Sequence, residues 1–166
     1  MRTGIYVAVP VMLLLAVLQT AVLPRFSILG LVPQLSFLVA LSWALLRGLE
    51  EGLAWAFIAG FSLDLFSIGP LGTTAIAYMT AVFVVMMLMR VLPENRFFIP
   101  VVMAALGSAV ALFVYLLFVR LLGFASSLET AVSLAPLIIL NAGFMLPVYW
   151  LIYSLDRLIH PRRVEL

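Results

Sequence analysis

The sequence predicts an all-α integral membrane protein, in which residues 1–166 form one domain of about six transmembrane helices with both termini in the cytoplasm. Hydrophobic residues make up 66% of the chain and charged residues only 10%, whereas an ordinary soluble domain carries roughly 25% charged residues. Polar, proline and glycine residues divide this apolar chain into runs of about the length that crosses a bilayer. Arginines concentrate in alternate connections between the runs, which orients the bundle.

The first apolar run, residues 4–23, is about 20 residues long, enough to cross the roughly 30 Å hydrocarbon core. The apolar part of a secretory signal is shorter, about 7–15 residues, so this run is interpreted as a span. The other spans are expected at residues 34–47, 52–67, 73–92, 98–122 and 131–155. The runs 34–47 and 52–67 are short for full spans, which need about 17–25 residues. Five spans are therefore the main alternative.

The placement of the arginines favours six spans, because cytoplasmic loops carry an excess of basic residues. With six spans and a cytoplasmic N-terminus, seven arginines are cytoplasmic and two are outside: Arg2, Arg47, Arg90, Arg96, Arg157, Arg162 and Arg163 against Arg25 and Arg120. Five spans would move the arginines of the short basic tail, residues 156–166, to the outside. Trp43, Trp55 and Trp150 also fall near the expected cytoplasmic ends, where indole rings favour the headgroup level.

Side chains that support catalysis or metal binding are scarce. The chain has no cysteine, and its single histidine, His160, lies in the expected tail. A nucleophile therefore lacks its base, and a metal centre lacks the usual ligands. Glu50 and Glu51 are similar to the Glu-Glu motif of intramembrane metal-dependent proteases, which needs later histidines, so we expect them to solvate a turn with Arg47. We therefore expect no enzymatic activity, catalytic residue, cofactor or metal. We also expect no nucleic acid partner, because the basic pI of about 9.4 reflects arginines in the loops.

A row of small residues leads to the carboxylate of Asp64. The row recurs at intervals of four and lies on one side of a helix: Gly48, Gly52, Ala56, Gly60 and Asp64, with Ser67 one turn beyond. Small residues at this spacing allow two helix backbones to approach closely in a membrane. The row is therefore expected to be a packing seam of the third helix.

Asp64 itself is a carboxylate inside the apolar run GFSLDLF, residues 60–66. Such residues usually face the bundle interior and find partners. The free N–H groups at the start of the fourth helix, after Pro70-Leu71-Gly72, attract anions. We therefore expect Asp64 to hydrogen-bond across the 67–72 turn, with Thr73 or Thr74 capping the fourth helix. Proton or ligand handling, and a contact with a partner, are the alternatives.

Gln19 in the first span and Asn141 in the sixth are the other polar residues expected at depth. Amide side chains hydrogen-bond between helices in membranes, for about 0.6 kcal/mol on average, and we expect both residues to join helices in this way. Pro136, Gly143 and Pro147 surround Asn141 and predict an irregular last helix, because proline kinks a helix and frees carbonyl groups.

The segment GFSLDLFSIGPLGTTAIAY, residues 60–78, resembles the signature region of the rod shape-determining protein MreD family. In that family an apolar helix ends in a Gly-x-x-x-Asp-x-x-Ser turn, and a Pro-Leu-Gly step leads into the next span. The matching positions are Gly60, Asp64, Ser67, Pro70, Leu71 and Gly72. Chain length, hydropathy and the short basic tail also fit this family.

The resemblance implies a non-enzymatic scaffold subunit of the cell-elongation complex in the bacterial inner membrane, where it supports peptidoglycan synthesis and cell shape. The implied direct partner is an MreC-like single-span protein. This partner connects the chain to a RodA-type glycosyltransferase, a penicillin-binding transpeptidase and the MreB filament. The seam of the third helix, or another face of small residues, is then a candidate docking surface, and the turn from Asp64 to Gly72 shapes the outer face.

The alternative function is a substrate-binding membrane subunit of a vitamin-type transporter, since the family resembles these subunits in span number and outline. Such a subunit needs a polar, aromatic-lined cavity that opens outward, for which Asp64, Asn141 and Tyr78 are candidates. It also needs a face of small residues, here Ala131 and Ala135. The 67–72 turn is short for capping a ligand, which favours the scaffold.

Overall fold

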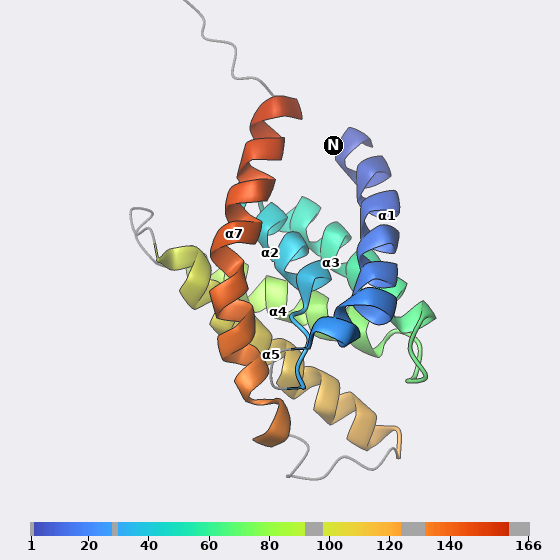
Figure 1. Cartoon of the computed structure of the whole chain (residues 1–166). Helices are drawn as coiled ribbons and strands as arrows, with labels where there is room; N and C mark the ends of the chain where they lie inside the picture. The colour runs from blue at the N-terminus through green and yellow to red at the C-terminus, as the bar shows by residue number, and fades with distance from the viewer. Residues whose placement is uncertain (1, 28–29, 92–97, 124–131, 160–166) are drawn as a thin grey trace, which may run out of the picture.

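The computed structural model describes residues 2–27, 30–91, 98–123 and 132–159, and these residues form an all-helical bundle (Figure 1). The α-helices in these ranges are α1 (Arg2–Val17), α2 (Leu35–Arg47), α3 (Leu49–Leu65), α4 (Thr73–Met89), α5 (Ile99–Leu121) and α7 (Pro136–Ile159). Helix α1 continues into a π-helical turn, η1 (Leu18–Val22), and a 3-10 turn, η2 (Leu23–Phe26). The all-α prediction is confirmed, and each expected apolar run overlaps one of these helices.

Three helices of the described chain are long and apolar enough to cross a membrane: Tyr6–Phe26, Ile99–Leu121 and Val132–Leu158. Leu35–Arg47 and Thr73–Met89 are shorter apolar helices. Figure 1 shows the first turn of α1 and the last turn of α7 at the same end of the bundle. The count of six spans and the cytoplasmic position of both termini stay predictions.

Helix α2 is the centre of the bundle. It contacts α1, α3, α4, α5 and α7, and all side chains from Ser36 to Ala44 are buried. Its 13 residues span only about 20 Å, less than the hydrocarbon core of a bilayer. A helix wrapped by other helices does not need to match the bilayer, because its ends are surrounded by protein rather than lipid. This explains why the corresponding apolar run is short.

Two helix boundaries differ from the sequence-based expectation. Helix α3 begins at Leu49, so Glu50 and Glu51 lie in its first turn rather than in a solvated turn between spans. Carboxylates are stabilised there by the partial positive charge of the helix N-terminus. Helix α7 continues to Ile159, so Asp156 and Arg157 are helical rather than part of a tail. The remaining tail, with His160, lies outside the described residues.

The tryptophans also correct a prediction. Trp43 and Trp55 are only 4% and 3% exposed, and their rings stack with centroids 4.3 Å apart. Trp43 Nε1 donates a 3.0 Å hydrogen bond to Glu51 Oε2. These two indoles therefore pack α2 against α3 instead of facing the lipid, while their depth in the membrane stays a prediction. Trp150, which is 73% exposed, is the one of the three whose side chain faces away from the bundle.

Candidate functional site

The carboxylate of Asp64, at the end of α3, organises the turn that leads into α4. Asp64 is 2% exposed. Its Oδ2 accepts hydrogen bonds from the backbone N–H groups of Gly72 at 2.9 Å, Thr74 at 3.1 Å and Ala75 at 3.3 Å. These donors belong to the first turn of α4, where N–H groups have no partner within the helix. A carboxylate satisfies them with charge-assisted bonds and complements the helix dipole, so the bonds expected across the turn are present.

The threonines do not cap α4 as expected. Thr73 Oγ1 donates to the carbonyl oxygen of Pro70 at 2.8 Å, and the N-cap residue is Gly72, whose φ of 90° lies in the left-handed region. A glycine adopts this conformation without the steric cost that a Cβ brings. The side chain of Asp64, eight residues upstream of Gly72, therefore replaces a local cap.

The turn presents an apolar tip away from the bundle. Ser67 Oγ accepts a 3.1 Å hydrogen bond from the N–H of Gly69, which closes the turn locally. Ile68 is fully exposed, and Leu71 is 68% exposed. The polar groups of the turn thus bond inward or to one another, while its large apolar side chains face outward.

The row of small residues on α3 lies inside the chain. A Cβ added at Gly60 would stand 2.7 Å from the carbonyl carbon of Thr74 and would collide with the backbone of Ala75. A Cβ added at Gly52 would stand 2.8 Å from the Cα of Ala44 on α2. Ala56, between them, is completely buried. The seam therefore packs α3 against α2 and α4 of the same chain, and the docking of a partner helix on it stays a prediction that this packing does not favour.

Asn141 joins three elements through a buried network. The backbone N–H of Gln34 donates to Asn141 Oδ1 at 2.9 Å. Asn141 Nδ2 donates to Gln34 Oε1 at 3.1 Å and to Ser108 Oγ at 3.0 Å. Asn141 is completely buried, and these bonds connect α7 with α5 and the start of α2, as expected for an amide between helices. Gln34 and Ser108 were not expected here, although Gln34 stands out as a polar residue at the start of the apolar run 34–47.

Gln19 connects η1 with α2. Its Oε1 accepts hydrogen bonds of 3.2 Å from both the backbone N–H and the hydroxyl of Ser36. Gln19 lies in the π-helical turn Leu18–Val22. Single π-helical turns inside helices are frequent at functional sites. The first helix is thus irregular. The last apolar run is irregular as well, because a turn at Ala135 interrupts the helix directly before Pro136, while α7 itself continues through Pro147.

A polar cavity of about 320 Å³ lies between these elements. The polar side chains around it include Gln19, Gln34, Ser67, Thr74, Tyr78 and Tyr115, and leucines form much of the remaining wall. Of the three residues considered for a transporter-type cavity, only Tyr78 lines it. Asp64 and Asn141 lie behind the wall, bonded to α4 and to Gln34. Ala131 lies outside the described residues.

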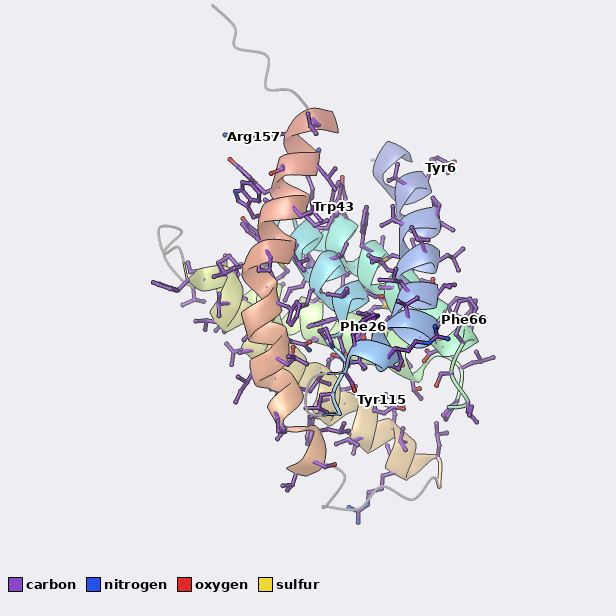
Figure 2. All side chains as sticks on the ribbon, in the orientation of Figure 1. Tyr6, Phe26, Trp43, Phe66, Tyr115 and Arg157 are labelled. Carbon is purple, nitrogen blue, oxygen red and sulfur yellow. The ribbon has the colours of Figure 1, made fainter. Side chains whose placement is uncertain are left out.

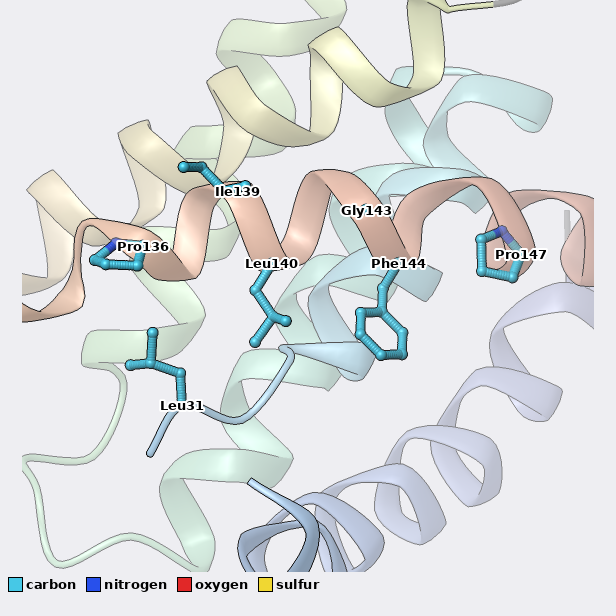
Figure 3. Close-up of a pocket in the computed structure, with 7 residues that line it drawn as sticks. All are labelled: Leu31, Pro136, Ile139, Leu140, Gly143, Phe144 and Pro147. Carbon is cyan, nitrogen blue, oxygen red and sulfur yellow. The ribbon is translucent and has the colours of Figure 1, made fainter. Parts of the chain in front are cut away.

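An apolar groove of about 610 Å³ runs along α7 between Pro136 and Pro147 (Figure 3). Figure 3 shows Leu140 and Phe144 projecting from α7 on the side where Leu31 lies. No atom lies within 4 Å of the position that a Cβ of Gly143 would occupy. The groove is thus floored by a residue without a side chain, and a further apolar segment would fit against it.

The end of the bundle where α2 ends carries charged contacts. Figure 2 labels Trp43 and Arg157 at this end and Tyr115 toward the other. Arg47 Nη2 lies 2.8 Å from Asp156 Oδ1, which links the end of α2 to α7. Among the described residues, no three His, Asp or Glu side chains gather into a group that would hold a metal ion. Many polar contacts of the described chain thus join one helix to another.

Comparison with family models places these features in a known group. The model described as rod shape-determining protein MreD matches residues 1–159. No match was found among curated proteins or among solved structures. The family match covers nearly all of the 166 residues, and it includes the braced turn from Gly60 to Gly72 that resembles the signature of that family. The chain therefore belongs to the rod shape-determining protein MreD family.

Proposed function

We propose that this chain is a non-enzymatic scaffold subunit of the bacterial cell-elongation complex, inserted in the inner membrane as a multi-pass protein. The family match over residues 1–159 carries the proposal, because it gives a role in rod-shape determination. The membrane location is supported by Tyr6–Phe26, Ile99–Leu121 and Val132–Leu158, each long and apolar enough for a span. With both termini in the cytoplasm and six spans, the turn around Asp64 lies at the outer face of the membrane.

The proposed direct partner is an MreC-like single-span membrane protein. Through it the chain supports peptidoglycan synthesis by a RodA-type glycosyltransferase and a penicillin-binding transpeptidase, coordinated with the MreB filament. A scaffold of this kind needs a face that is free to receive a transmembrane helix. Because the seam of α3 is filled by its own chain, another face has to serve.

The groove along α7 is the docking place that the geometry supports best. Its lining is apolar, and Gly143 leaves open space at its centre. Ile139, beside it, is 77% exposed. Positions without a side chain let two helix backbones approach closely, which is how helices associate where lipid removes the hydrophobic drive between them. We therefore assign the groove to the transmembrane helix of the MreC-like partner.

Co-purification in detergent tests this assignment. The wild-type chain is expected to retain a tagged MreC-like protein from the same genome through size exclusion. Gly143→Leu fills the floor of the groove and is expected to reduce the recovered partner several-fold. Val102→Leu is the matched control, because it adds one methylene at a half-exposed position of α5 outside the groove. Retention of the partner by Gly143→Leu would exclude the groove, and absence of the partner from the wild type would overturn the scaffold proposal.

The polar cavity favours a second candidate function, the substrate-binding subunit of a vitamin-type transporter. Its volume of about 320 Å³ lies at the lower end of the range for small-molecule sites. Co-purification of an energy-coupling transporter module, in place of an MreC-like protein, would favour this candidate. The family match supports the scaffold instead.

A further inference from the structure

The polar cavity has hydrogen-bonding groups that the protein itself leaves open. Gln34 Oε1 is engaged by Asn141, while within the described residues no hydrogen bond uses Gln34 Nε2, Thr74 Oγ1 or Tyr115 Oη. These groups come from three different elements and line one cavity. The three side chains are partly buried and face one space, so a guest in that space meets three groups that are open to hydrogen bonding.

The charge around the cavity restricts the class of guest. Among the residues that the structure describes, the lining contains no Arg or His, and no Asp or Glu. The carboxylate of Asp64 directs its oxygens to the N–H groups of Gly72, Thr74 and Ala75. An anion would lose its hydration there without gaining a cationic partner, and a cation would gain no open carboxylate. The lining therefore selects an uncharged group.

The hydrogen-bonding pattern restricts the guest further. The Gln34 amide nitrogen is a donor, whereas the hydroxyls of Thr74 and Tyr115 donate and accept. Hydroxyl groups on the guest satisfy both kinds at once, since each hydroxyl also donates and accepts. Leu63, Leu112, Leu134 and Leu137 form an apolar wall beside these groups. A guest with a hydroxyl-rich end and an apolar end fits both parts of the lining.

We propose that this cavity binds an uncharged polyhydroxyl group, such as the sugar or glycerol end of a neutral lipid. The cavity volume of about 320 Å³ equals roughly ten water molecules at liquid density. This is room for one small headgroup, with the acyl chains left to the leucine wall and the bilayer. The proposal concerns a site separate from the α7 groove and does not depend on the partner assigned to that groove.

Native mass spectrometry of the full chain tests the proposal. The protein is purified in an amine oxide detergent, because sugar-headgroup detergents would themselves occupy the site. Glucosyl-diacylglycerol is expected to bind with one molecule per chain, and phosphatidylcholine, which has no hydroxyl on its headgroup, at least about tenfold more weakly. Methyl glucoside distinguishes a free sugar from a lipid headgroup as the guest. If methyl glucoside displaces the lipid, the headgroup alone is recognised. If the lipid binds and methyl glucoside does not, the acyl chains are needed as well. Absence of binding by both would overturn the proposal.

Hydroxyl deletions locate the site. Thr74→Val keeps the shape of the side chain and the backbone N–H that Asp64 accepts, and Tyr115→Phe removes a single oxygen. The double variant is expected to bind glucosyl-diacylglycerol about tenfold more weakly, because it loses two hydrogen bonds. Thr80→Val on the same helix is the matched control, since Thr80 bonds to Ile76 outside the cavity. Wild-type affinity in the double variant, or equal binding of phosphatidylcholine, would overturn the proposal, and Tyr115→Phe alone gives the answer if Thr74→Val fails to fold.

Discussion

The Asp64 carboxylate and the Gly72 N–H are joined by a 2.9 Å hydrogen bond that fastens the end of α3 to the start of α4. Removal of the carboxylate leaves the N–H groups of Gly72, Thr74 and Ala75 without their acceptor at a partly buried site. We expect Asp64→Ala to lower the free energy of unfolding by about 3 kcal/mol, the upper range for a charged hydrogen-bonding group. Thermal unfolding in detergent measures this loss.

Asp64→Asn is the graded comparison, because its amide keeps one acceptor oxygen but loses the charge. It should fall between Asp64→Ala and the wild type. Ser154→Ala serves as control, since Ser154 is bonded only to the Trp150 carbonyl of its own helix among the described residues and its bond is exposed. Unfolding temperatures of Asp64→Ala and Asp64→Asn that match that control would show that the carboxylate does not brace the turn.

Gly60 and Gly143 give a second prediction, because both lie inside helices but in opposite surroundings. A Cβ at Gly60 collides with the backbone of α4, whereas a Cβ at Gly143 meets nothing within 4 Å. We expect Gly60→Ala to destabilise the protein by about 1–3 kcal/mol through overpacking. Gly143→Ala should be neutral or stabilising by up to about 1 kcal/mol, since alanine is the better helix former. Thermal unfolding of the pair checks this, and equal shifts in both variants would contradict the packing described for α3.

Local sequence was sufficient to predict the Asp64 bonds. The carboxylate and its donors lie within eleven residues of each other along the chain, so the end of one helix and the start of the next have little freedom to separate. The small-residue row was likewise identified as a packing surface. Its partners, Ala44 on α2 and Ala75 on α4, were not, because the row shows that a backbone approaches but not whose backbone it is.

Three features could not be predicted, and only the first depends on distant segments. Gln34 and Asn141 are 107 positions apart, and nothing in either neighbourhood specifies the other. Trp43 was assigned to the headgroup level from its position near a helix end. Its indole N–H instead finds Glu51 across the tight connection between α2 and α3, and this bond satisfies the polar atom inside the bundle. The π-helical turn around Gln19 has no glycine or proline signal of its own.

Asn141 gives the third prediction, since it connects three elements at once. We expect Asn141→Ala to lower the free energy of unfolding by about 2–3 kcal/mol. The variant leaves the backbone N–H of Gln34 without its acceptor and the hydroxyl oxygen of Ser108 without its donor. Ser108→Ala loses a single bond and should cost about 1 kcal/mol. Denaturation in detergent gives both values. A larger loss for Ser108→Ala than for Asn141→Ala would place the centre of the network elsewhere.

The ion pair between Arg47 and Asp156 gives the last prediction. The two side chains are 26% and 21% exposed, so water and salt screen part of their attraction. We expect Asp156→Asn to lower stability by about 1 kcal/mol at low ionic strength, near the upper end for partly exposed pairs, and by less at 1 M salt. A double-mutant cycle with Arg47→Gln isolates the pairwise energy from the contact of Arg47 with the Trp43 ring. A coupling energy of zero at low salt would mean that packing alone holds the end of α2 against α7.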